Sequence, residues 1–242
     1  MSDIPKDRFK SSYYDAEYFA GPTGGKSFLQ ADGALQKWSY FNPDGEWLGC
    51  KQITQAWKTM FNPTNFLDVG CGRGQMVAYA RNIGIEAEGF DYSEWATSDE
   101  GRYHRTEAEW IKCHDATEPW PYEDGSFELV VALDLFEHIY EDDIDFVIGE
   151  LYRVASKYAF LQIATTKGEG YILKKGVEVP LGLEGNAVAG HVTVMPEDWW
   201  NERLYDDEWL LSRSMVNHFC ALVDPDIIKN WVLNSIIAME RI

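Results

Sequence analysis

FLDVGCGRGQMVAYARNIGIEAEGFDYS, residues 66–93, is the stretch that decides the fold. A short apolar run at its start breaks into three glycines at alternating positions, Gly70, Gly72 and Gly74. Apolar residues then recur at helical spacing until Gly84, and a second apolar run ends on Asp91. A strand, a glycine turn, a helix and a second strand with an acid at its tip form one βαβ unit of the nucleoside-binding kind.

The chemistry of this turn suits a nucleoside that carries no pyrophosphate. Glycines let a ligand approach the backbone closely, and the helix that follows turns its free N–H groups toward that ligand. A carboxylate at the position of Asp91 is placed to accept hydrogen bonds from both hydroxyls of a ribose. The glycine spacing is GxGxG rather than GxGxxG, and no GK[ST] sequence follows to hold a triphosphate.

The composition is that of a globular protein with an acidic balance. The 242 residues are 45% hydrophobic and 25% charged, which suits one α/β domain with additions. The formal net charge of −19 would repel a polyanion, and no Lys/Arg-rich block marks a basic patch, so nucleic acid is a disfavoured partner. The acidity also fits simple solubility or adaptation to salt.

Cysteine usage and hydropathy predict a cytoplasmic protein with no membrane segment. The four cysteines are spread singly, which indicates neither a disulfide framework nor a thiolate zinc site. No apolar run is long enough to span a bilayer, and residues 1–11 are polar rather than typical of a signal sequence. We expect a monomer or a homodimer.

Strands alternate with helices along most of the chain, which predicts a parallel sheet with right-handed crossovers. We expect an α/β fold with a doubly wound, mostly parallel seven-stranded sheet and helices on both faces. Residues 1–47 are expected to form a cap or lid, and residues 48–242 one domain with an insertion at about 165–190 after the fifth strand. The last two strands are predicted at residues 210–219 and 231–241.

Four acids fall within or at the ends of predicted strands, where the ligands of such sheets bind. They are Asp68, Asp91, Asp115 and Asp134. A single acid at a strand end is common. Four of them beside a GxGxG turn indicate one site.

Several motifs, in this order, resemble those of the class I S-adenosylmethionine-dependent methyltransferases of the broad small-molecule type. They are LDVGCGRG from Leu67, GFDYS ending at Ser93, HDATEPWPYEDGSFELVVALDLFEHI from His114, and GHVTVMPEDWW from Gly190. The resemblance covers the chain from about Leu48 to its end. It implies S-adenosyl-L-methionine as the cofactor and S-adenosyl-L-homocysteine as the product.

The resemblance also implies which residues contact this cofactor. Those expected beside its amino-acid part are Asp68, Gly70, Cys71, Gly72 and Gly74. Those expected at the nucleoside are Asp91 for the ribose hydroxyls, Tyr92 for the adenine face, and Asp115 and Ala116 for the adenine edge. Those expected beneath the methionine portion and its methyl group are Leu133, Asp134 and Phe136. Arg73 departs from the family pattern, and we expect its side chain to point to solvent.

Methyl transfer needs a general base only when the nucleophile arrives protonated. His191 lies where the family often has a histidine near the substrate, and His138 and Glu137 are further catalytic candidates. Each of them could instead hold its own segment in place. The candidate substrate-binding residues are Tyr14, Tyr18, Trp199 and Trp200, for which core packing is the alternative.

The expected function is transfer of a methyl group to an O or N nucleophile of a small molecule, such as a metabolite, a sugar or a natural-product precursor, by in-line displacement. One alternative is an RNA or protein methyltransferase, which would need a positive groove or an open cleft. Another is a catalytically silent regulatory subunit that binds the cofactor. His104, His114 and His218 show no metal-ligand spacing with an acid or a cysteine, so no metal site is predicted.

Overall fold

The central sheet of the computed structural model has seven strands and is mostly parallel, as the sequence predicts. The structure describes residues 9–19, 27–29, 35–37, 49–165, 190–228 and 234–242. The strands of the sheet are β3 (Asn65–Val69), β4 (Glu86–Asp91), β5 (Ile111–Cys113), β6 (Phe127–Leu133), β7 (Ala155–Ala164), β8 (Trp209–Leu211) and β9 (Asn234–Arg241). Their order is β5-β4-β3-β6-β7-β9-β8.

The direction of the chain through the sheet reverses between β3 and β6. From β3 the chain moves outward through β4 to β5, and it returns to the other side of β3 as β6, followed by β7. These five strands are parallel, whereas β9 runs antiparallel to both β7 and β8. In such sheets ligands bind at the carboxyl ends of the strands beside the point of reversal, which here is the edge formed by the ends of β3, β4 and β6.

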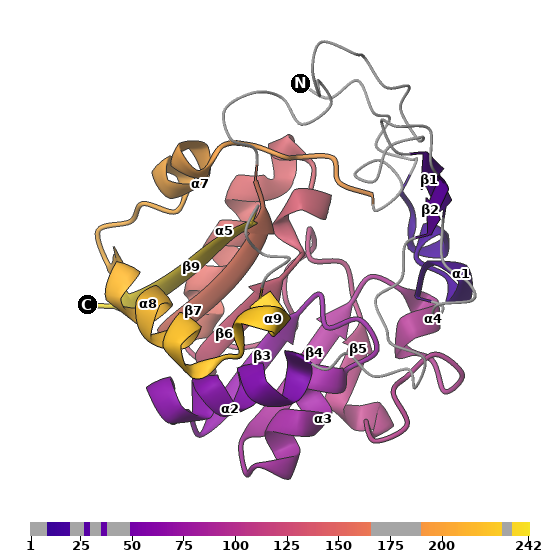
Figure 1. Cartoon of the computed structure of the whole chain (residues 1–242), viewed down its shortest axis with the longest axis horizontal. Coiled ribbons are helices and arrows are strands. Elements are labelled where there is room, and N and C mark those ends of the chain that lie inside the picture. The colour runs from indigo at the N-terminus through magenta and orange to yellow at the C-terminus, as the bar shows by residue number, and fades with distance from the viewer. Residues whose placement is uncertain (1–8, 20–26, 30–34, 38–48, 166–189, 229–233) are drawn as a thin grey trace.

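Helices pack on both faces of this sheet (Figure 1). One face carries α2 (Gly49–Phe61), α3 (Gln75–Asn82) and α8 (Arg213–Leu222), and its core includes the rings of Trp57, Phe160 and Phe219. The other face carries α5 (Ile144–Val154) and α7 (Glu197–Arg203), which bury Leu151 and Trp200. Burial of these apolar faces on both sides of the sheet is the main stabilising contribution to the fold.

Shorter elements surround the sheet. The helices are α1 (Ala16–Phe19), α4 (Glu94–Thr97) and α9 (Pro225–Ile228), and the 3-10 turns span Ser11–Tyr13, Ala108–Trp110, Phe136–His138 and Glu141–Asp143. A separate antiparallel hairpin consists of β1 (Ser27–Leu29) and β2 (Leu35–Lys37). This hairpin and α1 lie on the same side of the molecule as α4 (Figure 1).

The strand predicted at residues 210–219 is wrong over most of its length. The strand β8 ends at Leu211, and the helix α8 begins directly after Ser212. The Ser212 side chain accepts a hydrogen bond from the backbone N–H of Met215 at 3.3 Å, which is a helix N-cap. Val216 and Phe219, three positions apart, are both buried, which is the pattern of an amphipathic helix. The N-cap and this pattern explain why the apolar run forms a helix and not a strand. The strand predicted at residues 231–241 corresponds to β9.

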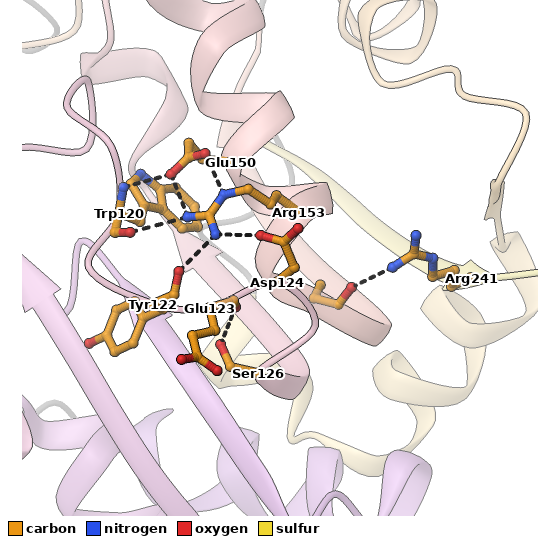
Figure 2. Close-up of polar contacts among 9 residues, drawn as sticks. Trp120, Tyr122, Glu123, Asp124, Ser126, Glu150, Arg153 and Arg241 are labelled. Atoms are coloured by element: carbon orange, nitrogen blue, oxygen red, sulfur yellow. Dashed lines mark hydrogen bonds and ion pairs between the residues drawn. The ribbon is translucent and has the colours of Figure 1, made fainter.

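Arg153 of α5 anchors the loop between β5 and β6. Figure 2 shows its guanidinium group between two acids and the loop backbone. It donates to the carbonyls of Tyr122 at 2.7 Å and Trp120 at 3.1 Å. It also pairs with Asp124 at 2.9 Å and, through two nitrogens, with Glu150 at 2.7 and 2.8 Å. This network holds the turn-rich loop in one conformation against α5.

The predicted insertion at about 165–190 lies, apart from its two ends, outside the described residues, so the domain boundaries stay predictions. Of the N-terminal segment, residues 9–19, 27–29 and 35–37 are described, and Phe9–Phe19 packs against Val192 and the segment that follows β4. No helix in the described part of the chain has both the length and the apolar character needed to cross a bilayer.

Candidate active site

The glycine turn after β3 is fastened to the end of β4. The backbone N–H groups of Gly70 and Cys71 both donate to the carbonyl of Phe90, at 2.9 and 3.0 Å. Gly74 has a φ of +77°, and a Cβ atom there would lie 2.7 Å from Cγ2 of Thr106. Only glycine fits this position, because the backbone is left-handed and the space beside it is filled. The turn therefore leads into the N-terminus of α3 at a fixed place.

Asp91 links this turn to the end of β4. One of its carboxylate oxygens accepts a hydrogen bond from the backbone N–H of Gly72 at 2.7 Å, and the other accepts from Ser93 at 2.8 Å. Burial raises the pKa of Asp91, and these two hydrogen bonds act in the opposite direction. Each oxygen keeps one lone pair, which leaves acceptors for a diol. The adjacent Tyr92 is partly exposed, as a side chain that packs on a ligand ring would be.

Asp68 places a second acid beneath the turn. Its side chain is 4% exposed, and burial, followed by the charge of Asp91, raises its pKa to about 8. Burial and the same two acids raise the pKa of the Cys71 thiol as well. Within the described residues, no Lys or Arg pairs with Asp68 or Asp91. A cationic ligand beside Asp68 and Asp91 would therefore favour their charged forms.

The residues expected at the adenine edge lie beside Asp91. The backbone of His114 donates to the Asp91 carbonyl at 3.0 Å, so the segment after β5 runs next to the end of β4. The Asp115 carboxylate accepts from the backbone and the hydroxyl of Thr117, at 2.9 and 2.8 Å. Ala116 is buried, and its carbonyl accepts from the Trp120 indole at 3.0 Å.

The end of β6 supplies the third side of the site. Asp134 adopts a φ of +52°, which is rare for a residue with a side chain and is held by a hydrogen bond from its N–H to the Gln162 carbonyl at 2.9 Å. Burial raises the pKa of its carboxyl group to about 6, against the opposing effect of the Gln162 and Glu137 side chains. Leu133 is half-buried, whereas Phe136 is fully buried and packs on Trp200.

Leu135 is a contact that sequence reasoning missed. Its Cδ1 atom lies 3.0 Å from the point where a Cβ atom of Gly70 would stand. The β6 loop and the glycine turn therefore touch, and together they enclose the place between the ends of β3 and β6. No local pattern marks Leu135, since the contact joins segments far apart in the sequence.

The three catalytic candidates come together in one cluster. His191 Nε2 lies 4.0 Å from Glu137 Oε1, and the rings of His138 and His191 meet edge to face with centroids 4.8 Å apart. Two hydrogen bonds fasten the loop that carries His191, because Val192 and Thr193 both donate to the Glu137 carbonyl, at 2.8 and 3.0 Å. The tertiary structure thus unites residues that are more than fifty positions apart.

Burial sets the protonation states in this cluster. It raises the pKa of Glu137 well above its usual value, with a further contribution from Asp134. It lowers the pKa of His138 to about 4 and that of His191 well below the ordinary value, the latter also because of His138. Both imidazoles are therefore neutral near pH 7, and each has one nitrogen lone pair that is able to accept a proton or bind a metal.

Tyr14 is the cap residue that reaches this cluster. Its hydroxyl lies 3.3 Å from His138 Nδ1, and its carbonyl accepts a hydrogen bond from the Ser93 hydroxyl at 2.5 Å. Its ring also packs near Tyr92, with centroids 6.4 Å apart. Tyr18 is 2% exposed and lies behind Tyr14, so it forms part of the cap's core.

The two tryptophans of α7 both pack against other aromatic rings. Trp200 has no exposed surface and packs in the core, which corresponds to core packing, the alternative to substrate binding. Trp199 packs on Trp200, and the Arg203 guanidinium carbon lies 4.2 Å from the centroid of the Trp199 ring.

The expectation for Arg73 was wrong, because its side chain donates to the Gly101 carbonyl and lies over the Trp95 ring instead of pointing to solvent.

Comparison with known proteins finds a family whose model matches the part of the chain that contains this site. Residues 67–162, which run from the glycine turn through the β6 loop to β7, match the family model described as a methyltransferase domain. The chain carries a class I, Rossmann-like methyltransferase domain. The matched residues of this methyltransferase domain include Asp68, Asp91 and Asp134, together with Glu137 and His138.

Relatives and solved structures agree with this family. A curated relative, norajmaline N-methyltransferase of Rauvolfia serpentina, is 34% identical over 98 residues, which are 39% of this chain and 33% of that protein. The chain thus matches about a third of the length of that relative.

Among solved structures, the plantazolicin methyltransferase BpumL, in complex with a substrate analogue and S-adenosylhomocysteine, has a TM-score of 0.56 at 12% identity, over 79% of this chain and 82% of that one. Magnesium protoporphyrin IX methyltransferase from Synechocystis, with bound S-adenosylhomocysteine, has a TM-score of 0.55 at 18% identity, over 81% of this chain and 84% of that one. At these identities the two structures support the fold of the methyltransferase domain.

Proposed function

We propose that this chain is an S-adenosylmethionine-dependent methyltransferase that acts on an O or N nucleophile of a small molecule. The observation that carries the proposal is the Asp91 carboxylate held against the glycine turn by Gly72, within a matched methyltransferase domain. A GxGxG turn with a carboxylate beside it suits a nucleoside with no phosphate.

The side chains present fit S-adenosylmethionine. A ribose needs a carboxylate with free acceptor capacity, which Asp91 provides. The cofactor carries positive charge on its sulfonium and ammonium groups, and the buried Asp68 and the half-buried Asp134 have no cationic partner among the described residues. The proposed adenine contacts are Asp115, Ala116 and Tyr92, and the proposed supports of the methionine portion are Leu133 and Phe136.

The cofactor, when bound, supplies an activated methyl group for in-line displacement. The protein orients the acceptor, excludes water and, where the acceptor is protonated, takes up its proton. Neutral His191 and His138 stand beside the buried Glu137 for the last task, with the imidazoles as the proton acceptors. Tyr14 of the cap closes over them and supplies one wall of the acceptor site, whereas a role for Tyr18, Trp199 or Trp200 would need the cap or α7 to shift.

The acceptor is proposed to be small because of the cap and the charge. Tyr14 lies directly over the catalytic cluster, which narrows the access that a macromolecule would need. The net charge of −19 works against RNA. Norajmaline, plantazolicin and magnesium protoporphyrin IX, named with the similar proteins, are all metabolites or natural products of modest size.

The setting of the enzyme is proposed from the same features. All four cysteines are free, as in a reducing cytoplasm. We expect a monomer or homodimer that acts with a small-molecule substrate and without a membrane or nucleic acid partner. Size-exclusion chromatography with light scattering measures the oligomeric state directly.

Calorimetry with S-adenosylmethionine and S-adenosylhomocysteine tests the core of the proposal. We expect binding of one ligand per chain at micromolar Kd or tighter, about −8 kcal/mol. Affinity weaker than this for both ligands would overturn the proposal. Transfer of a labelled methyl group to a panel of phenols, alcohols and amines then separates an active enzyme from a silent cofactor-binding subunit, and a parallel panel of tRNA and peptides tests the alternative acceptors.

A further inference from the structure

We propose that Glu137, His138 and His191 bind one divalent transition-metal ion beside the cofactor site. Each of the three offers one ligand atom, and these atoms all lie within 4.8 Å of one another. Two imidazoles and one carboxylate are a set that zinc and ferrous ions take in catalytic sites, where further coordination positions stay open. The spacing of these residues in the sequence does not suggest such a site, because His191 comes from a distant loop.

Atoms of the cluster that make no hydrogen bond support a missing ligand. Glu137 is 0% exposed, and its Oε2 atom has no hydrogen-bond partner. His191 Nδ1 is likewise buried and without a partner. Buried polar atoms are almost always hydrogen-bonded. Two such atoms without a hydrogen bond in one cluster indicate a bound group that accepts their lone pairs. A cation does this for both a carboxylate and a neutral imidazole.

The charge of the cluster points to the same occupant. Glu137 lies against a second acid, the half-buried Asp134, and no Lys or Arg of the described residues pairs with either of them. Buried carboxylates are stable when paired with a cation or bound to a metal. Without such an ion a proton keeps Glu137 neutral, because its pKa is raised well above the ordinary value, and a doubly charged ion would displace this proton.

The proposed ligands are held by the contacts that metal ligands usually have. The Ala164 backbone donates to Glu137 Oε1 at 3.1 Å, which orients the carboxylate. The Tyr14 hydroxyl lies 3.3 Å from His138 Nδ1, and the Glu137 carbonyl fixes the loop of His191 through Val192. Ligand atoms around zinc stand about 3.4 Å apart, at bond lengths of about 2.1 Å. The separations of up to 4.8 Å between these ligand atoms therefore have to shorten by up to about 1.4 Å when the ion binds.

The ion gives the site a preference for an oxygen acceptor, and this step rests on the proposed methyl transfer. Three protein ligands leave a position for the acceptor's hydroxyl oxygen, and the bound hydroxyl loses its proton to solvent more readily than a free one. The acceptor oxygen then forms a bond to the methyl carbon as the carbon–sulfur bond breaks, and that electron pair stays on sulfur. A phenol or an alcohol is thus methylated near neutral pH without a separate strong base.

Metal titrations of the full chain test this proposal without cofactor or turnover. After removal of any affinity tag and treatment with chelator, the protein is titrated with ZnCl2, MnCl2 and MgCl2 by calorimetry, and with CoCl2 by visible absorption. We expect one Zn2+ per chain at a Kd of 10 μM or below, and a Co2+ spectrum with nitrogen and oxygen ligation. His191→Ala should weaken the affinity at least tenfold, and Glu137→Gln should do the same.

Two controls keep the outcome decisive. His218→Ala removes an exposed histidine far along the chain and should leave the affinity unchanged. Thermal unfolding of each variant without metal shows whether it is folded, and His138→Ala serves as the second ligand variant if Glu137→Gln is not. No saturable binding, or equal affinity in wild type, His191→Ala and His138→Ala, overturns the proposal. Metal binding without S-adenosylmethionine binding would instead contradict the proposed function alone, and the reverse result would contradict only the metal site.

Discussion

The carboxylate of Asp91 and the backbone N–H of Gly72 lie 2.7 Å apart and form a hydrogen bond that joins the end of β4 to the glycine turn. The carboxylate that shapes the turn is also the one that we propose binds the ribose. The hydrogen bond from Ser93 to the other oxygen fixes the orientation of the group. The proposed ribose site is therefore preorganised by hydrogen bonds within the chain.

Asp91→Asn is expected to weaken S-adenosylhomocysteine binding by about 1.5–3 kcal/mol, which is roughly 10- to 150-fold, because a hydrogen bond to a charged acceptor is lost. Calorimetry measures the affinity, and thermal unfolding checks that the turn still forms. The exposed Asp207→Asn is the matched control and should bind normally. Unchanged affinity in Asp91→Asn would refute the ribose assignment.

Gly74→Ala is expected to destabilise the chain more than Gly84→Ala. Both glycines have positive φ, at +77° and +80°, so both substitutions carry a backbone cost of about 1–2 kcal/mol. A Cβ atom at Gly74 would also press on the buried Thr106, whereas nothing lies within 4 Å of one at Gly84. Overpacking adds about 1–3 kcal/mol. Urea unfolding of the two variants side by side isolates the steric part, and equal losses would show that Thr106 moves aside freely.

Stability is expected to fall as the pH rises from about 4 to about 8, in part because of Asp68. The native state binds the Asp68 proton more tightly than the unfolded chain does, since the pKa is raised from 3.8 to about 8. The stabilisation is complete below pH 4 and is lost as the pH passes through 8. Its size is on the order of several kcal/mol.

Denaturant unfolding at pH 5, 6, 7 and 8 measures this slope in wild type and in Asp68→Asn. The variant keeps a neutral side chain at every pH, so its slope should be flatter, while Asp134 and Glu137 contribute equally in both proteins. Identical slopes would mean that Asp68 is ionised in the folded chain throughout this range.

Arg153→Lys is expected to cost about 1–3 kcal/mol of stability, because lysine cannot serve Glu150, Asp124 and the loop carbonyls together. The free energy of unfolding from urea titrations measures the loss. Arg213→Lys is the control, since its partner Glu197 is at a similar distance of 2.8 Å but its side chain is 70% exposed. That exchange should change stability by less than about 0.5 kcal/mol. Equal losses of stability in Arg153→Lys and Arg213→Lys would show that the contacts of Arg153 in Figure 2 contribute no more than an exposed ion pair.

Local patterns in the sequence were sufficient for the core of the fold, whereas the residues assigned to the cofactor stay predictions. Two short apolar runs, the helical spacing of apolar residues between them and the glycines at the turn located β3, α3 and β4 within a few residues. Acids at consecutive strand ends then followed from the rule that parallel strands present their carboxyl ends at one edge. Where a short capping signal and an apolar run overlapped, as at Ser212, the pattern was ambiguous and the strand prediction was wrong.

What the sequence determined by itself is the αβ order of the methyltransferase domain and the set of acids at its strand ends, because these depend on backbone geometry within short windows. What only the tertiary structure decided is the meeting of Glu137, His138 and His191 under Tyr14, and the enclosure of Trp200 in the core. Those contacts depend on the paths of loops between distant segments. Burial then sets the charge of each group, and burial is a property of the packed chain and of no single stretch of it.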